Sequence, residues 1–237
     1  MAEETVGQVL PTSTGFAAKQ AVAFLREHNV AAASLLQRAD LSERHFDKRP
    51  RRILAATQSK LLEYASEALE DSAFGLHLAQ SNPREAGLLF YVASAAKSIG
   101  EALTLYARYS RIVNEAVRVK LVHAQNGVVV EFHFVGVSRH RVRQNAEFGI
   151  AAIVKGLREV AGRNIHPTRV TFAHERNSNL RQFERFFGCP VDFGGSIDQL
   201  SFSNETLALP PAHHRRPVSL GYAPALSLRG REGAQHA

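Results

Sequence analysis

The chain has 237 residues, 45% of them hydrophobic and 22% charged, which is the composition of a folded soluble protein. These values exclude a disordered, collagen-like or fibrous chain, and at roughly 100–200 residues per domain the length allows one large domain or two small ones. The net charge of +7 and the pI near 9.9 are compatible with a nucleic-acid partner without requiring one.

The first half of the chain is predicted to be helical. Apolar residues recur at helical spacing in residues 16–28, 30–39 and 53–69. The preceding stretch, residues 1–15, is expected to be a flexible N-terminus.

Capping residues predict where two further helices begin. Asp71 and Ser72 are candidate N-caps of a short helix that runs through Ala79. Ser98 with Glu101 three residues later forms a capping box, so a longer helix is expected to open at this point.

The pattern changes to that of strands at Val117. Residues 117–124 alternate apolar and polar side chains, and residues 128–137 are rich in β-branched and aromatic types. Asn126 and Gly127 lie between them, and both tolerate the positive φ of a type I′ turn, so a hairpin is expected. A helical period then returns over residues 141–161, with Gly162 placed to end the helix.

The remaining elements complete the predicted fold. A strand is expected at 168–174, then a short helix capped by Ser178 that ends at Gly188, then strands near Val191 and at 200–202. The order is helices followed by β-β-α-β-α-β-β, which lacks the strict alternation of a doubly wound parallel sheet. We therefore expect an α+β fold with a mixed or antiparallel sheet and covering helices.

The C-terminal stretch, residues 211–237, has scattered Pro and Gly residues and no sustained period. It carries four arginines against one glutamate, so we expect a basic, disordered tail with weak, salt-sensitive affinity for polyanions. The folded domain is expected to span residues 16–210.

The usual signatures of phosphate, dinucleotide and helix-borne zinc sites are missing from the sequence. The histidines of the predicted strands, His123, His133 and His174, have the spacing of no standard metal-ligand set. Cys189, the single cysteine, follows the C-terminal end of a predicted helix, where the helix dipole disfavours a thiolate. We therefore expect no catalytic residue, no metal and no cofactor.

The location of the protein follows from the same residues. One cysteine excludes an internal disulfide framework and fits a reducing compartment. Glu3 and Glu4 stand where a signal peptide would be basic, and no apolar run approaches the roughly 20 residues of a membrane span. We expect a cytoplasmic protein without a membrane partner.

A basic segment at residues 44–52 is the one local indication of DNA binding. It contains Arg49, Arg51 and Arg52 and follows a helix-turn-helix-like stretch, so these arginines could contact phosphates. Pro50 interrupts the segment and nearby acidic residues dilute its charge. A solvated connection between helices is the favoured interpretation, with DNA binding as the alternative.

Several stretches, taken in order, resemble the N-terminal sensor domain of AraC-type transcription regulators, in the branch of the ornithine-utilisation regulator. The resemblance covers most of residues 16–210. It rests on the segments DSAFGLHL (71–78), GLLFY (87–91), SIGEAL (98–103), PTRVTFAH (167–174), FFGCPVDFG (186–194), LSF (200–202) and LALP (207–210), with Tyr106 and Tyr109.

This resemblance implies a domain that senses a small-molecule effector, often self-associates and is not an enzyme. Such domains precede a DNA-binding unit of two helix-turn-helix motifs, whose pattern is missing after Pro210, so we expect a truncated or frameshifted chain. Its partners would be the effector, a second copy or a full-length regulator, with DNA bound only weakly or through that partner.

Candidate ligand contacts come from aromatic and polar residues near the hairpin and the preceding helices, since ligand sites are mostly apolar with a few placed polar groups. The candidates are Phe90, Tyr91, Tyr106, Glu131 and His133. Alternation also places Glu131 and His133 opposite Phe132, which favours a solvent-facing role for the pair. A small-molecule enzyme that uses Glu131 and His133 is the remaining alternative.

Overall fold

The computed structural model describes residues 10–46, 51–81, 87–138 and 141–212. Its helices are α1 (Phe16–Glu27), α2 (Ala32–Arg38), α3 (Ala55–Ala68), α4 (Phe74–Gln80), α5 (Leu88–Ser94), α6 (Ile99–Val113), α7 (Arg143–Ala161), α8 (Leu180–Phe187) and α9 (Asn204–Leu207), with a 3₁₀ turn, η1, at Glu43–Phe46. Its strands are β1 (Thr12–Ser13), β2 (Ile53–Leu54), β3 (Val117–Ala124), β4 (Gly127–Phe134), β5 (Arg169–Thr171), β6 (Val191–Asp192) and β7 (Asp198–Ser203).

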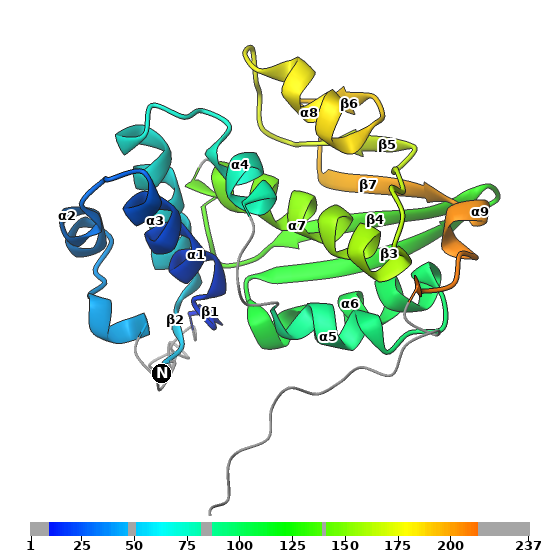
Figure 1. Cartoon of the computed structure of the whole chain (residues 1–237), viewed down its shortest axis with the longest axis horizontal. Coiled ribbons are helices and arrows are strands. Elements are labelled where there is room, and N and C mark those ends of the chain that lie inside the picture. Colours follow the sequence, from blue (N-terminus) through cyan, green and yellow to red (C-terminus); the bar gives the residue numbers. More distant parts are fainter. Residues whose placement is uncertain (1–9, 47–50, 82–86, 139–140, 213–237) are drawn as a thin grey trace, which may run out of the picture.

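The main sheet has five strands in the order β3-β4-β7-β5-β6 (Figure 1). All neighbouring pairs are antiparallel except β5 and β6, which are parallel. The mixed α+β fold and the order β-β-α-β-α-β-β are therefore confirmed.

The β3–β4 hairpin is confirmed, but its turn lies one residue earlier than predicted. Ala124 pairs with Gly127, so the turn residues are Gln125 and Asn126, and neither has a positive φ. The predicted type I′ turn is therefore wrong. Gly127 is needed for another reason, because a Cβ at this position would lie 1.9 Å from the backbone oxygen of Phe202 on β7.

Local capping signals set the start of α6 and the end of α7. The Ser98 side chain accepts a hydrogen bond from the Glu101 N–H, as the capping box predicts. The carboxylate of Glu101 in turn accepts from the Lys97 N–H at 2.6 Å. Gly162 ends α7 in the left-handed conformation that favours glycine, as expected.

Several boundaries differ from the prediction, and at three of the helix starts tertiary contacts or other caps set them. The strand predicted at 168–174 is also shorter, Arg169–Thr171. Ile53 and Leu54 pair with residues 12 and 13, within the stretch expected to be flexible, so α3 begins only at Ala55. The helix after Asp71 begins at Phe74 without a side-chain cap. The N-cap of α8 is Asn179, in a left-handed conformation, and not Ser178.

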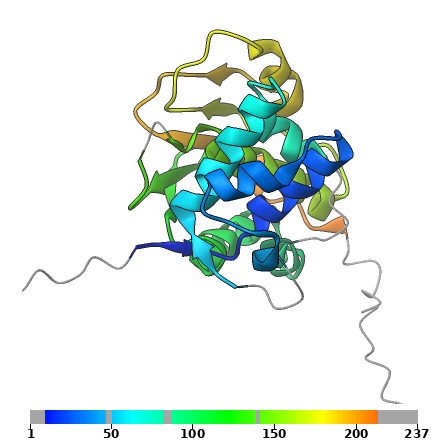
Figure 2. The same ribbon diagram turned by 90° about the vertical axis from the view of Figure 1, so that its left-hand side faces the viewer.

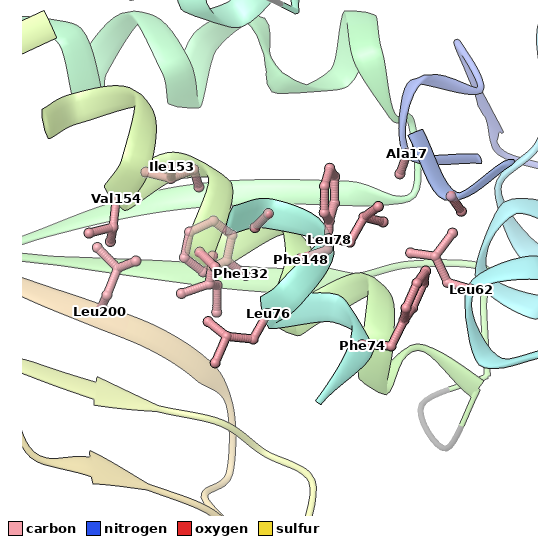
Figure 3. Packing of buried hydrophobic residues seen from close by; sticks show 14 of the residues in the cluster. Ala17, Leu62, Phe74, Leu76, Leu78, Phe132, Phe148, Ile153, Val154 and Leu200 are labelled. Carbon is pink, nitrogen blue, oxygen red and sulfur yellow. The ribbon is translucent and has the colours of Figure 1, made fainter. Parts of the chain in front are cut away.

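The core lies between α7, the main sheet and the N-terminal helices. Val154 of α7 points towards Leu200 of β7 in Figure 3, and both side chains are buried. The same apolar cluster continues through Leu76 of α4 to Leu62 of α3 and Ala17 of α1. The early helices form a layer at one end of the molecule, in blue and cyan in Figure 2. Helix α7 therefore connects the two halves of the fold.

Two terminal segments, residues 1–9 and 213–237, lie outside the described residues, so most of the predicted tail has no structural description. In the ranges that the structure covers, no helix is long and apolar enough to span a membrane.

Candidate functional site

A large cavity lies where α1, α5, α6 and α7 approach one another. Its volume is about 980 Å³, which reaches the size of pockets that hold small molecules. Figure 1 shows α5 and α6 on the same side of α7, with α1 beside them. The lining apolar side chains are those of Phe16, Phe46, Leu78, Leu88, Leu89, Phe90, Leu103, Val113, Phe148, Ile153 and Leu157.

Small residues on α7 keep one wall of this cavity open. Gly149, Ala152 and Gly156 share a helix face by their spacing, and all three line the cavity. An added Cβ at Gly149 or Gly156 would find no other described segment within 4 Å. Glycine inside a helix is less stable than alanine by about 0.5–1 kcal/mol. The cavity therefore exists at some cost to the stability of α7.

Aromatic side chains form the inner part of the cavity. The Phe16 and Phe148 rings are tilted, with their centroids 6.5 Å apart, and Tyr106 lines the same wall. Burial raises the pKa of Tyr106, so its hydroxyl stays neutral and can donate a hydrogen bond. A smaller cavity of about 90 Å³ shares these three rings and adds the hydrogen-bonded pair Gln58 and Asn145.

Charged residues of the lining are mostly cationic. The lining contains the ammonium groups of Lys19 and Lys155, one carboxylate, that of Glu159, and the imidazole of His45. Lys19 and Glu159 are exposed, whereas Lys155 is half-buried. The Lys155 ammonium donates to the Ser81 carbonyl at 2.7 Å and to the Gln80 carbonyl at 3.4 Å, just beyond α4 and at its last residue.

The structure brings together only two of the five candidate ligand contacts. Phe90 and Tyr106 both line the large cavity. Tyr91 is 60% exposed on α5 and is not part of the lining. Glu131 and His133 lie on the other face of the sheet from Phe132, which lines the smaller cavity.

Glu131 and His133 instead belong to a surface ion-pair group. His133 Nε2 lies 3.2 Å from Glu131 Oε2, and Lys120 Nζ lies 3.8 Å from the same oxygen. The His133 side chain is 43% exposed. This geometry is that of the solvent-facing pair favoured above.

Sequence reasoning missed the α1 and α7 walls of the cavity. Gly149 and Gly156 are seven residues apart within a long helical pattern, and glycine is unfavourable there. That unusual pair is the signal that could have pointed to an open helix face. No local signal indicates that Phe16 and Lys19 lie across from this face.

One arginine of the basic segment 44–52 is held at the surface by other parts of the chain. Arg52 donates to the Thr12 hydroxyl at 2.6 Å and to the Ile112 carbonyl at 2.8 Å, and it lies 3.3 Å from Glu115. Arg51 is exposed, and Arg49 lies outside the described residues. The guanidinium of Arg52 is thus occupied by protein groups, which disfavours the DNA-binding alternative.

Cys189 and the groups of possible metal ligands were the other candidates for reactivity among the described residues. Cys189 follows the C-terminal end of α8, and burial raises the pKa of its thiol to about 11. Such a thiol stays protonated at neutral pH and is a poor nucleophile. Within the described ranges, no three His, Cys, Asp or Glu side chains are grouped closely enough to hold a metal ion.

A buried ionic cluster lies on the far side of α7 from the cavity. Glu147 is fully buried, and its Oε1 accepts from Arg176 and contacts His174 Nε2 at 2.7 Å. Arg176 also donates to the Ser72 carbonyl at 2.8 Å, which joins the segment before α4 to the loop after β5. We define Glu147, His174 and Arg176 as the buried ionic cluster.

Comparison with known proteins agrees with this fold. Residues 30–211 match the family described as "Arabinose-binding domain of AraC transcription regulator, N-term". The crystal structure of the transcriptional regulator CdpR from Pseudomonas aeruginosa is similar, with a TM-score of 0.58 and 18% sequence identity. The match covers 83% of this chain and 57% of the CdpR chain, so the present chain spans little more than half the length of CdpR. No curated protein matches this sequence.

Proposed function

This chain belongs to the family of N-terminal arabinose-binding domains of AraC transcription regulators, and from this premise we propose that it senses a small-molecule effector in the control of transcription. The observation that carries the proposal is the cavity of about 980 Å³ between α1, α5, α6 and α7. Ligand sites typically have apolar walls with a few placed polar groups, and the lining of this cavity supports the proposal in that respect. No residue is assigned a catalytic role.

The proposed effector contacts follow the lining of the cavity. Phe90 and Tyr106 are retained from the sequence-based candidates, and Phe16, Phe148 and Lys155 are added. DNA would be contacted weakly or through a partner, either a second copy or a full-length regulator, in the cytoplasm. These partners are part of the proposal.

Filling the cavity from α7 tests whether it holds the effector. We expect Gly149→Leu with Gly156→Leu to weaken effector binding by about ten- to a hundredfold, since overpacking a fitted site costs about 1–3 kcal/mol. The matched control is Gly149→Ala with Gly156→Ala, which adds only methyl groups and should bind as the wild type does. Effectors are found by thermal shift of the full chain against a metabolite library, and affinities are measured by calorimetry.

Stability measurements make this test independent of folding. Alanine in place of each glycine should raise the free energy of unfolding by about 0.5–1 kcal/mol, because the Cβ enters open space in a helix. The leucine variant should also remain folded, since leucine is a strong helix former. An effector bound equally well by the wild type and the leucine variant would place the ligand site elsewhere.

A further inference from the structure

The large cavity is poorly suited to a free sugar. Its walls are built mainly from Phe, Leu, Ile, Ala and Gly residues of α1, α5, α6 and α7. A pentose in contact with these apolar walls would leave the hydroxyl groups on that side without hydrogen-bond partners, and each unpaired hydroxyl costs free energy. The polar side chains of the lining are those of Thr14, Lys19, Gln20, His45, Tyr106, Lys155 and Glu159. The lining favours a ligand with an apolar body.

Lys155 supplies the one half-buried ammonium group of the lining. Two of its three N–H donors reach the carbonyls of Gln80 and Ser81, which leaves a third donor for another acceptor. Among the described residues, Glu159, four residues further along α7, is the carboxylate whose charge acts on the Lys155 ammonium. Burial lowers the pKa of Lys155, which means that the charged form pays a desolvation cost.

A bound anion would offset this cost. A carboxylate that accepts the third N–H would form a charge-assisted hydrogen bond in surroundings of low polarity, where such bonds are strong. Lys155 is therefore the group of the lining that would hold such a carboxylate.

We propose that the effector is an apolar monocarboxylate whose carboxylate binds Lys155 while its hydrocarbon body lies against Gly149, Ala152 and Gly156. This inference rests on the proposed function, because it names the chemical class of ligand for the same cavity. It also assigns Lys155 as the residue that selects the anionic group.

Four probes of matched design test the ligand class by calorimetry on the full chain. Decanoate, decan-1-ol and decyltrimethylammonium share a ten-carbon apolar body and carry a negative, a neutral and a positive group. The fourth probe, L-arabinose, is a neutral sugar without an apolar body. We expect decanoate to bind about ten- to a hundredfold more tightly than decan-1-ol, because hydrogen bonds to charged groups contribute about 1.5–3 kcal/mol. The cationic probe and arabinose should bind most weakly.

Substitution of the ammonium group tests the role of Lys155. Lys155→Met should weaken decanoate binding far more than decan-1-ol binding, which removes the preference for decanoate, and Lys155→Arg should keep the preference. Lys120→Met is the matched control, because Lys120 lies on β3 with its side chain 67% exposed. Thermal melting verifies that each variant is folded. If Lys155→Met does not fold, the ratio of the decanoate and decan-1-ol affinities of the wild type still decides the ligand class.

The outcomes separate this inference from the proposed function. Equal affinity for decanoate and decan-1-ol, both lost in the double leucine variant, would overturn the carboxylate and keep the cavity as a ligand site. If the wild type bound arabinose and the double leucine variant did not, the proposal of an apolar ligand would be overturned. Failure of all alkyl probes, with another effector bound in the cavity, would also reject the class without rejecting the sensor.

Discussion

Replacement of Arg176 by Met is expected to lower the free energy of unfolding by about 3–5 kcal/mol, because it leaves the buried Glu147 carboxylate without its arginine and with His174 alone. The Arg176 side chain is 3% exposed and that of Glu147 is fully buried. Arg176 also lies 4.6 Å from the centroid of the Phe183 ring and donates to the Ser72 carbonyl. Urea unfolding of the full chain measures the loss.

A double-mutant cycle separates the ion pair from the packing of the arginine stem. Glu147→Gln alone should also destabilise, whereas Glu147→Gln with Arg176→Met should lose less than the sum, because each partner is costly mainly when unpaired. Arg185→Met on the exposed face of α8 is the matched control and should change stability by less than about 0.5 kcal/mol. A loss below about 1 kcal/mol in Arg176→Met would show that Glu147 finds other partners.

The buried ionic cluster connects segments that are far apart in the sequence. It ties the segment before α4 and the loop after β5 to α7, and α7 also forms a wall of the cavity. Buried Glu147 Oε2 and Arg176 Nε have no hydrogen-bond partner among the described residues, so the cluster is only partly satisfied. Such a network is sensitive to the loss of any further contact.

Local sequence signals predicted the parts of this fold that local physics determines. The capping box at Ser98, the left-handed Gly162 and the alternation over Val117–Ala124 each depend on residues within a few positions. The structure confirms these elements. The hairpin turn was misplaced by one residue because the close approach of Gly127 to β7, and not a turn preference, requires glycine there.

The cavity could not be predicted in the same way because it is assembled from distant segments. Phe16 on α1 and Phe148 on α7 lie more than a hundred residues apart in sequence and meet only in the folded chain. Tyr91 follows Phe90 directly but points to solvent, since neighbouring residues of a helix do not share a face. Glu131 and His133 share a strand with Phe132 but face the other side of the sheet.

Phe172→Ala is expected to lower the free energy of unfolding by about 3–5 kcal/mol, the range for deleting a buried phenyl ring. Phe172 is fully buried beside β5. Its ring stacks on Phe193 at 5.2 Å and meets Phe183 edge-on at 5.8 Å. Phe172→Leu, which leaves a smaller cavity, should cost clearly less, and both variants are measured by urea unfolding.

The same cluster predicts that Phe172 and Arg176 are energetically coupled. Arg176 lies over the rings of Phe183 and Phe193, and both rings pack against Phe172. Residues that share partners show interaction free energies of about 0.5–3 kcal/mol, so Phe172→Ala with Arg176→Met should lose less than the two single losses combined. Strict additivity would mean that the aromatic packing and the buried ionic cluster stabilise the fold independently, even though they share Phe183 and Phe193.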